Sequence, residues 1–169
     1  KLGEKQIVAS IGDNKFCSLV EAYEAANDAD TIVIEDEIYV TNNQKIVNEK
    51  DIIIDINGNT IYNCAEGGLF VNKANLSIKD SLDNGLILSY SGQTIKNNAE
   101  ATLEILNGNY KITRIRGNIL SNYGTTNIRN GNFYSSIDCK NVEHPILRNS
   151  GSGILNIYDG KIKITQSLY

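Results

Sequence analysis

The sequence predicts an all-β solenoid, a parallel β-helix whose amino-terminal end is covered by a short α-helix. Three observations lead to this fold class: an asparagine returns about every 25 residues, a glycine returns at a similar interval, and short runs of alternating apolar and polar residues lie between them. A fixed period of this length is typical of solenoids, in which each repeat packs on its neighbours. The 169 residues are enough for one domain with a continuous core.

The asparagine marks one corner of each predicted coil. Successive copies are 24, 25, 25 and 27 residues apart. A large apolar residue precedes each copy by two positions, and from the second copy onward a very small residue follows by two. We predict a column in which each amide hydrogen-bonds to the next, at a corner whose left-handed conformation asparagine tolerates. The ladder residues are Asn48, Asn72, Asn97, Asn122 and Asn149.

The glycine separates two predicted strands in each coil and always follows Asn or Asp. Leu103 and Ile105 alternate with polar residues before Gly108, and Tyr110 continues the alternation after it. This period of two is the strand signal, and no run of helical length intervenes. We therefore expect three short strands per coil, with coils about 4.8 Å apart and with Tyr110 and Phe133 in an inward column. A β-sandwich of similar short strands is the alternative.

The amino-terminal residues predict a cap rather than a coil. Residues 7–11 have a strand pattern, and residues 18–27 have the pattern of an amphipathic helix of two to three turns. Ser18 and Glu21 have the spacing of a capping box. The apolar face of this helix consists of Leu19, Ala22, Tyr23 and Ala26. Because a solenoid exposes a hydrophobic end, we expect the helix to cover the first coil.

This pattern divides the chain into a cap, residues 1–30, and the coils, residues 31–169. The chain starts without a signal peptide, and its last residues read as a strand still in progress. We therefore expect the chain to be a fragment of a longer protein.

The order VASIGDNKFCSLVEAYEAANDADTIVI, followed by IIIDINGNTI, resembles the start of pectin-lyase-like right-handed β-helix domains. The resemblance covers about the first sixty residues, and the rest by coil pattern alone. It implies right-handed coils, as does the usual hand of parallel crossovers. It also implies a place in a large bacterial secreted or surface protein. The superfamily includes polysaccharide lyases, glycoside hydrolases, phage tailspikes and adhesins, so the resemblance specifies a fold and not an activity.

Composition argues against several classes of partner. The net charge is −4 and no basic cluster carries interleaved aromatic residues, which argues against nucleic acid. No apolar stretch approaches the length of a membrane span. Cys17, Cys64 and Cys139 lack the spacing of metal ligands, and we expect them in or near the core. We predict neither a metal nor a cofactor.

Enzymes of the family that the chain resembles place catalytic groups as outward side chains on adjacent coils. The expected outward columns of this chain carry scattered cations and aromatic residues instead of stacked acids. One such column consists of Ile61, Leu88, Lys111, Tyr134 and Lys163. Asp80 and Asp83 occur together, but in a turn where Asp is common for backbone reasons. We therefore predict no catalytic residue.

Two segments stand out as candidates for binding. The turn at residues 113–118 carries two arginines, and residues 136–145 form an insertion of about six residues with the only histidine. Long loops on a rigid scaffold are where binding concentrates, and a cationic, aromatic face can hold an acidic glycan or protein. The candidate ligand-binding residues are Lys111, Arg114, Arg116, Arg129, Tyr134, Asp138 and His144.

These observations favour a non-catalytic β-helix module of an extracellular, secreted or cell-surface bacterial protein. We expect a structural or adhesive role, with a polysaccharide or a host or cell-surface protein as partner. The first alternative is a polysaccharide lyase or glycoside hydrolase domain, supported by the cations near Lys111 and by the insertion. The second is a phage tail-fibre domain.

Overall fold

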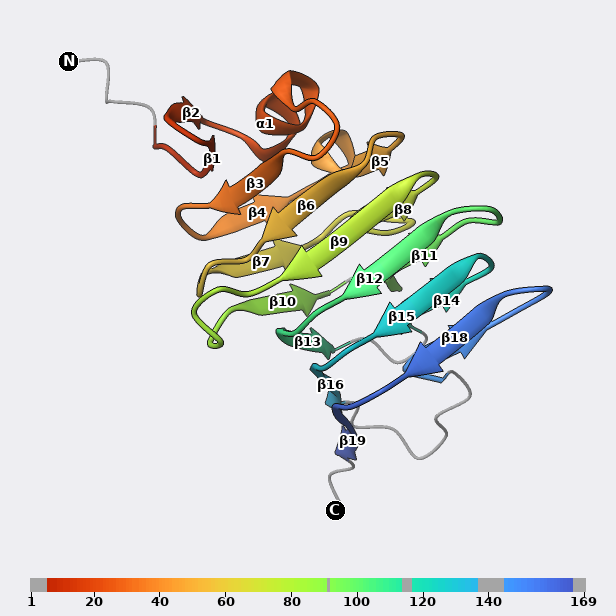
Figure 1. Ribbon diagram of the computed structural model, residues 1–169. Coiled ribbons are helices and arrows are strands. Elements are labelled where there is room, and N and C mark those ends of the chain that lie inside the picture. Colours follow the sequence, from red (N-terminus) through yellow and green to blue (C-terminus); the bar gives the residue numbers. More distant parts are fainter. Residues whose placement is uncertain (1–5, 91, 114–116, 137–144, 166–169) are drawn as a thin grey trace.

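The computed structural model describes residues 6–90, 92–113, 117–136 and 145–165, and these form a parallel β-helix with one short α-helix at its amino-terminal end (Figure 1). Strands of successive coils stack in register into three parallel sheets, here named sheet A, sheet B and sheet C. Each coil contributes one strand to each sheet in that order. The predicted fold class is therefore confirmed, and the sandwich alternative is wrong.

The strands are short, between three and five residues each. Sheet A contains β3 (Thr31–Ile34), β6 (Ile52–Asp55), β9 (Asn75–Lys79), β12 (Thr102–Ile105), β15 (Thr125–Ile128) and β18 (Ile154–Ile157). Sheet B contains β4 (Ile38–Val40), β7 (Thr60–Asn63), β10 (Leu86–Ser89), β13 (Asn109–Ile112), β16 (Asn132–Ser136) and β19 (Lys161–Thr165). Sheet C contains β5 (Ile46–Asn48), β8 (Phe70–Asn72), β11 (Gln93–Asn97), β14 (Asn118–Asn122) and β17 (Leu147–Asn149).

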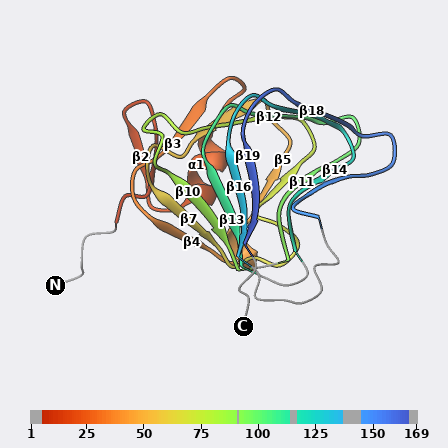
Figure 2. The same ribbon diagram turned by 90° about the horizontal axis from the view of Figure 1, so that it is seen from below.

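The three sheets enclose a core of triangular cross-section. In Figure 2, seen from the carboxyl-terminal end, the chain passes counter-clockwise from sheet A to sheet B to sheet C as it approaches the viewer, which is a right-handed coil. Inward side chains form stacked columns, as the alternation predicted. Tyr110 and Phe133 are both buried, and their rings stack with centroids 5.0 Å apart.

A continuous asparagine ladder runs along the corner between sheet C and sheet A. Each Nδ2 donates to the Oδ1 of the next coil's asparagine, over distances of 2.8, 2.8, 2.9 and 2.7 Å from Asn48 through to Asn149. Asn97, for example, is fully buried and also donates to the carbonyl oxygen of Thr125 at 2.9 Å. The ladder therefore bonds coil to coil through side chains as well as through the strands.

The conformation predicted for these asparagines is wrong. They are the last residues of sheet C strands and have extended backbones. Among the described non-glycine residues, the positive φ angles belong to Ala29, Asn57, Asp83 and Glu100. Because the amide has to reach along the solenoid axis to the next coil, an inward-pointing strand residue serves this purpose better than a turn residue.

The amino-terminal end is covered by α1 (Leu19–Ala25) and by an antiparallel hairpin of β1 (Ala9–Ile11) and β2 (Asn14–Phe16), which extends sheet A through β3. Ser18 Oγ accepts from the amide of Glu21 at 3.1 Å. The Glu21 carboxylate accepts from the amide of Cys17 at 3.2 Å, one residue before the position that the capping box predicted. Leu19, Ala22 and Ala26 are buried against the core, and Tyr23 is half-buried.

Lys50, which follows the first ladder asparagine, ties the helix to the first coil. Its Nζ donates to the carbonyl oxygens of Tyr23 at 2.9 Å and Ala26 at 2.8 Å, where the helix ends. The same Nζ lies 4.8 Å from the centre of the Tyr23 ring. A cation at a helix carboxyl terminus is electrostatically favourable, so this contact fixes the orientation of the cap.

At the opposite end the inward columns reach solvent. Ile157 and Ile162 are 49% and 53% exposed, whereas Ile128 and Phe133, their neighbours one coil earlier, are buried. The cysteines also differ from the prediction, because Cys64 is exposed and Cys17 is half-buried. Both thiols are free, and Cys139 lies outside the described residues. No helix in the described part of the chain has the length and apolar character needed to cross a bilayer.

Candidate ligand-binding face

The outward side of sheet B carries one column of aromatic, aliphatic and cationic side chains. The register of the parallel strands aligns one residue from each coil, and the column consists of Tyr39, Tyr62, Leu88, Lys111, Tyr134 and Lys163. With about 4.8 Å between coils, these side chains form a stripe parallel to the solenoid axis. We refer to this stripe as the sheet B face.

The sequence assigned Ile61 to this column, and that assignment is wrong. Ile61 is fully buried and aligns with Ile87 in the inward column, so Tyr62 takes the outward position. The cause is one additional residue, Asn59, in the turn between Gly58 and β7. Since side chains alternate between the two faces of a strand, a shift of one residue exchanges inside and outside.

The carboxyl-terminal half of the face is hollowed into an open groove of about 520 Å³. Lys111, Tyr134 and Lys163 line it from adjacent coils, with Leu86 and Asn109 beside them. Asn132 Nδ2 donates to Asn109 Oδ1 at 2.9 Å, so this part of the wall is held in place by a second asparagine contact between coils. The described lining contains two cations, an aromatic ring and amides, and no carboxylate.

The amino-terminal half of the face is a stack of tyrosine rings. Tyr39 and Tyr62 lie with centroids 4.3 Å apart and planes 7° apart, and Tyr90 continues the stack at 6.5 Å from Tyr62. Partial desolvation, together with the nearby Glu37 carboxylate and Tyr39, raises the pKa of Tyr62. Tyr39 is 58% exposed, and one face of its ring is free of the stack.

Arg129 does not line the groove. Its Nε donates to the Glu104 carboxylate at 2.6 Å, and its guanidinium carbon lies 4.4 Å from the centre of the Tyr158 ring. This hydrogen bond to the Glu104 carboxylate raises the pKa of Arg129. This arginine belongs to the turn between sheets A and B and is already paired, so the structure separates it from Lys111 and Tyr134.

The other sequence-predicted binding residues, Arg114, Arg116, Asp138 and His144, lie outside the described residues. The connectivity of the described strands still constrains where their segments begin. The chain enters residues 114–116 from β13, which carries Lys111, and enters residues 137–144 from β16, which carries Tyr134.

Sequence reasoning missed a pair of acids on adjacent coils. Asp55 and Asp80 lie where sheet A turns toward sheet B, and both are nearly fully buried. The Asp80 carboxylate accepts from the amides of Gly58 at 2.7 Å and Gly85 at 2.5 Å. The backbone role expected for Asp80 is confirmed, but its pairing with Asp55 was missed because Asp55 ends a strand and Asp80 follows one.

The Asp55 carboxylate also accepts hydrogen bonds from several groups of the protein. It accepts from the amide of Asn57 at 3.0 Å, from the amide and hydroxyl of Ser81, and from Lys79 Nζ at 3.2 Å. Burial raises the pKa of Asp55, but the hydrogen bonds from Ser81 and the Lys79 ammonium outweigh burial and leave the pKa below its usual range. Both acids therefore hold turns together and have no open position facing a substrate.

Among the described residues, no three His, Cys, Asp or Glu side chains converge in a way that could hold a metal ion. Comparison of the chain with protein-family models, with curated proteins and with solved structures finds no match. The class of protein is therefore defined by the fold and by the chemistry of its outer face.

Proposed function

We propose that this chain is a non-catalytic module of the pectin-lyase-like β-helix class, part of a bacterial secreted or cell-surface protein, with a structural and adhesive role. The sheet B face is its ligand-binding surface, and an acidic glycan is the ligand that the groove suits best. The observation that carries this proposal is the alignment of Lys111, Tyr134 and Lys163 on adjacent coils around one open groove.

The chemistry of the groove suits binding better than cleavage. Glycoside hydrolysis requires two carboxyl groups placed on either side of one bond. The described lining offers ammonium groups, a tyrosine ring and amides, and the buried acids Asp55 and Asp80 are already bound by backbone amides. Ammonium groups attract carboxylate or sulfate groups, and a tyrosine ring provides a flat surface against which a sugar ring packs.

A binding assay with matched variants tests this proposal. We expect the chain to bind polygalacturonate or a sulfated glycan on a panel that also holds neutral polysaccharides. The double variant Lys111→Ala/Lys163→Ala should weaken this binding by about tenfold or more, which corresponds to about 1.4 kcal/mol. Lys45→Ala, which removes an exposed lysine of the first coil, is the matched control and should bind like the parent.

Two further measurements complete the test: the dependence of glycan binding on salt concentration, and the release of glycan fragments. Binding to exposed ammonium groups should weaken as salt is raised, because the charges are screened. Unchanged binding of the double variant would show that the groove is not the site. Release of glycan fragments that depends on Lys111 would instead make the chain a carbohydrate-active enzyme.

A further inference from the structure

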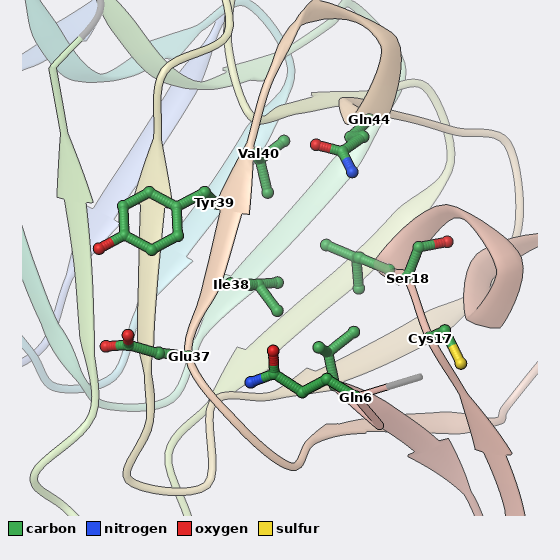
Figure 3. Close-up of a pocket in the computed structure, with 10 residues that line it drawn as sticks. Gln6, Cys17, Ser18, Glu37, Ile38, Tyr39, Val40 and Gln44 are labelled. Carbon is green, nitrogen blue, oxygen red and sulfur yellow. The ribbon is translucent and has the colours of Figure 1, made fainter. Parts of the chain in front are cut away.

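A second cavity, of about 200 Å³, lies at the amino-terminal end of the solenoid, between the cap and the first strand of sheet B (Figure 3). In Figure 3, Ile38 and Val40 project from β4 toward the start of α1, and Tyr39 projects to the opposite side. Val8 and Leu19 supply apolar lining from the cap. Pockets that hold drug-sized molecules are larger, about 300–1,000 Å³, so this cavity suits individual side chains better.

The cavity lies beside an unpaired strand edge. β4 is the last strand of sheet B and pairs with β7 alone. The amide of Cys64 donates to the carbonyl oxygen of Val40 at 2.9 Å. Alternate residues of a parallel strand direct their backbone groups to the same neighbour, so Ile38 and Val40 bond toward β7. The N–H and C=O of Tyr39 therefore point away from β7, to the open edge.

Flanking amides on this edge are bound within the chain itself. The amide of Glu37 donates to Asp36 Oδ1 at 2.8 Å, and the amide of Thr41 donates to Gln44 Oε1 at 3.2 Å. Between them, the backbone of Tyr39 offers one donor and one acceptor. Among the described residues, the edge is therefore blocked at both ends and open over the central residue of a three-residue strand.

The cap contacts the chain at or next to the first strands of the other two sheets. β3 pairs with β1 of the cap hairpin, and beyond β5 the amide of Glu49 donates to the Tyr23 hydroxyl at 2.8 Å. The cap thus adds a strand to sheet A and contacts the chain beyond β5, whereas no described residue pairs with the outer edge of β4. Exposed strand edges are templates for pairing with another chain.

We propose that the β4 edge binds an extended peptide segment of a partner protein, which adds a strand to sheet B. Main-chain bonds to Tyr39 would hold the segment, and pockets for alternate side chains would select its sequence. The complementary sequence is apolar, aromatic, apolar. The two apolar side chains enter the cavity over Val8 and Leu19, and the central aromatic ring stacks on the free face of Tyr39.

The negative charge of Glu37 beside the β4 edge favours a peptide that carries a basic residue. Glu37 is exposed at one end of β4 and forms no ion pair within the described residues. A basic residue next to the apolar positions of the peptide can pair with it. This site is independent of the groove at Lys111 and Lys163, which lies in later coils, so either assignment can fail without the other.

A defined peptide tests the proposal without altering the protein. The probe is acetyl-KVYVK-amide, whose symmetry allows either strand direction, and the readout is the backbone amide spectrum of the labelled 169-residue chain. We expect saturable shifts confined to β4 and the cavity lining, and slower hydrogen exchange at the Tyr39 amide. Absence of these shifts would overturn the proposal.

N-methylated versions of the peptide supply the matched control. A strand paired antiparallel uses the amide of its tyrosine, and a parallel strand uses the amide of its second valine. Methylation of one of these two amides should weaken binding by about tenfold, the loss expected for one hydrogen bond. In an antiparallel strand both valine amides point away from β4, and in a parallel strand the tyrosine amide does, so methylation at the position that points away should leave binding unchanged. Equal binding of all three peptides would overturn the assignment.

Variants of the protein distinguish the contribution of the Tyr39 backbone to peptide binding from that of the Tyr39 ring. Tyr39→Pro removes both the edge amide and the ring and should abolish binding, while Tyr39→Thr keeps the amide and should retain weaker binding. Tyr123→Thr, far from β4 in sequence and outside sheet B, is the control for tyrosine removal. The parent chain could instead fail to bind the peptide and dimerise with rising concentration, in a way that Tyr39→Pro removes. That result would assign the edge to a second copy of the chain and overturn the proposal of a partner peptide.

Discussion

At the scale of single residues, the ladder asparagines satisfy several partners at once. Asn97 Nδ2 lies within hydrogen-bond distance of Asn122 Oδ1, the Thr125 carbonyl oxygen and the Ala101 carbonyl oxygen. Its Oδ1 accepts from Asn72 at 2.8 Å. Because the site is fully buried, no water is available to replace these bonds.

Replacing Asn97 with Leu should therefore lower the free energy of unfolding by about 1–3 kcal/mol, because the amide of Asn72 and the carbonyl oxygens lose a buried partner. Urea unfolding followed by circular dichroism measures the change. Asn98→Leu, at the half-buried neighbour whose side chain forms no hydrogen bond in the described part, should change stability much less. Equal costs at the two positions would mean that the ladder contributes little.

Asp55 makes stability depend on pH. Its folded pKa lies below the usual value, so its stabilising contribution is present above the unfolded pKa of about 3.9 and is lost as pH falls through the folded pKa. Asp55→Asn should be less stable than the parent at pH 7, and the difference should shrink at pH values below about 4. Urea unfolding at several pH values measures it. Asp13→Asn, at an exposed residue of the cap hairpin, should follow the parent throughout.

At the scale of elements, α1 combines local signals with one tertiary contact. Ser18 begins the helix, while Lys50 from the first coil binds the carbonyl oxygens where it ends. The apolar side of the helix then covers the end of the core, and Leu19 is only 3% exposed.

Leu19→Asp should destabilise the cap strongly, by about 3 kcal/mol or more, because it places an unpaired carboxylate against the core. Hydrogen exchange should show faster exchange in β1 to β5 than in β12 to β15, since each coil contacts its nearest neighbours. Ala25→Asp places the same charge on the exposed side of α1 and should cost less than about 1 kcal/mol. A uniform rise in exchange across all coils would contradict this gradient.

At the scale of the whole molecule, burial differs between the two ends. The cap buries the amino-terminal end of the core, while inward side chains of the last described strands are partly exposed. Ile128 and Ile157 occupy the same inward column one coil apart, yet the first is buried and the second is 49% exposed.

Substitutions at Ile128 and Ile157 test this difference in burial directly. Ile128→Ala should cost about 2–4 kcal/mol, as expected for a large-to-small change in a closed core, and Ile157→Ala should cost less than about 1 kcal/mol. Thermal or urea unfolding of the two variants measures both values. A similar cost for both changes would show that a partner covers this end in solution.

The repeat was sufficient to predict the β-helix and the positions of the ladder asparagines, and the helical spacing of residues 18–27 predicted the amino-terminal helix. These features depend on local spacing, and a period shared by every coil leaves few ways to stack them. The groove residues Lys111 and Tyr134 were also recognisable, because they alternate with the buried Tyr110 and Phe133 in strands whose register is regular.

Other features were decided only by the tertiary structure. The turn residue Asn59 shifts β7 by one position, so the stacking of Tyr39 on Tyr62 could not be read from a fixed distance to glycine. The neighbouring Asp55 and Asp80 come together across two coils, and the open edge of β4 depends on where the cap stops. Columns follow from spacing along the chain, but edges, corners and grooves depend on how successive coils are placed beside one another.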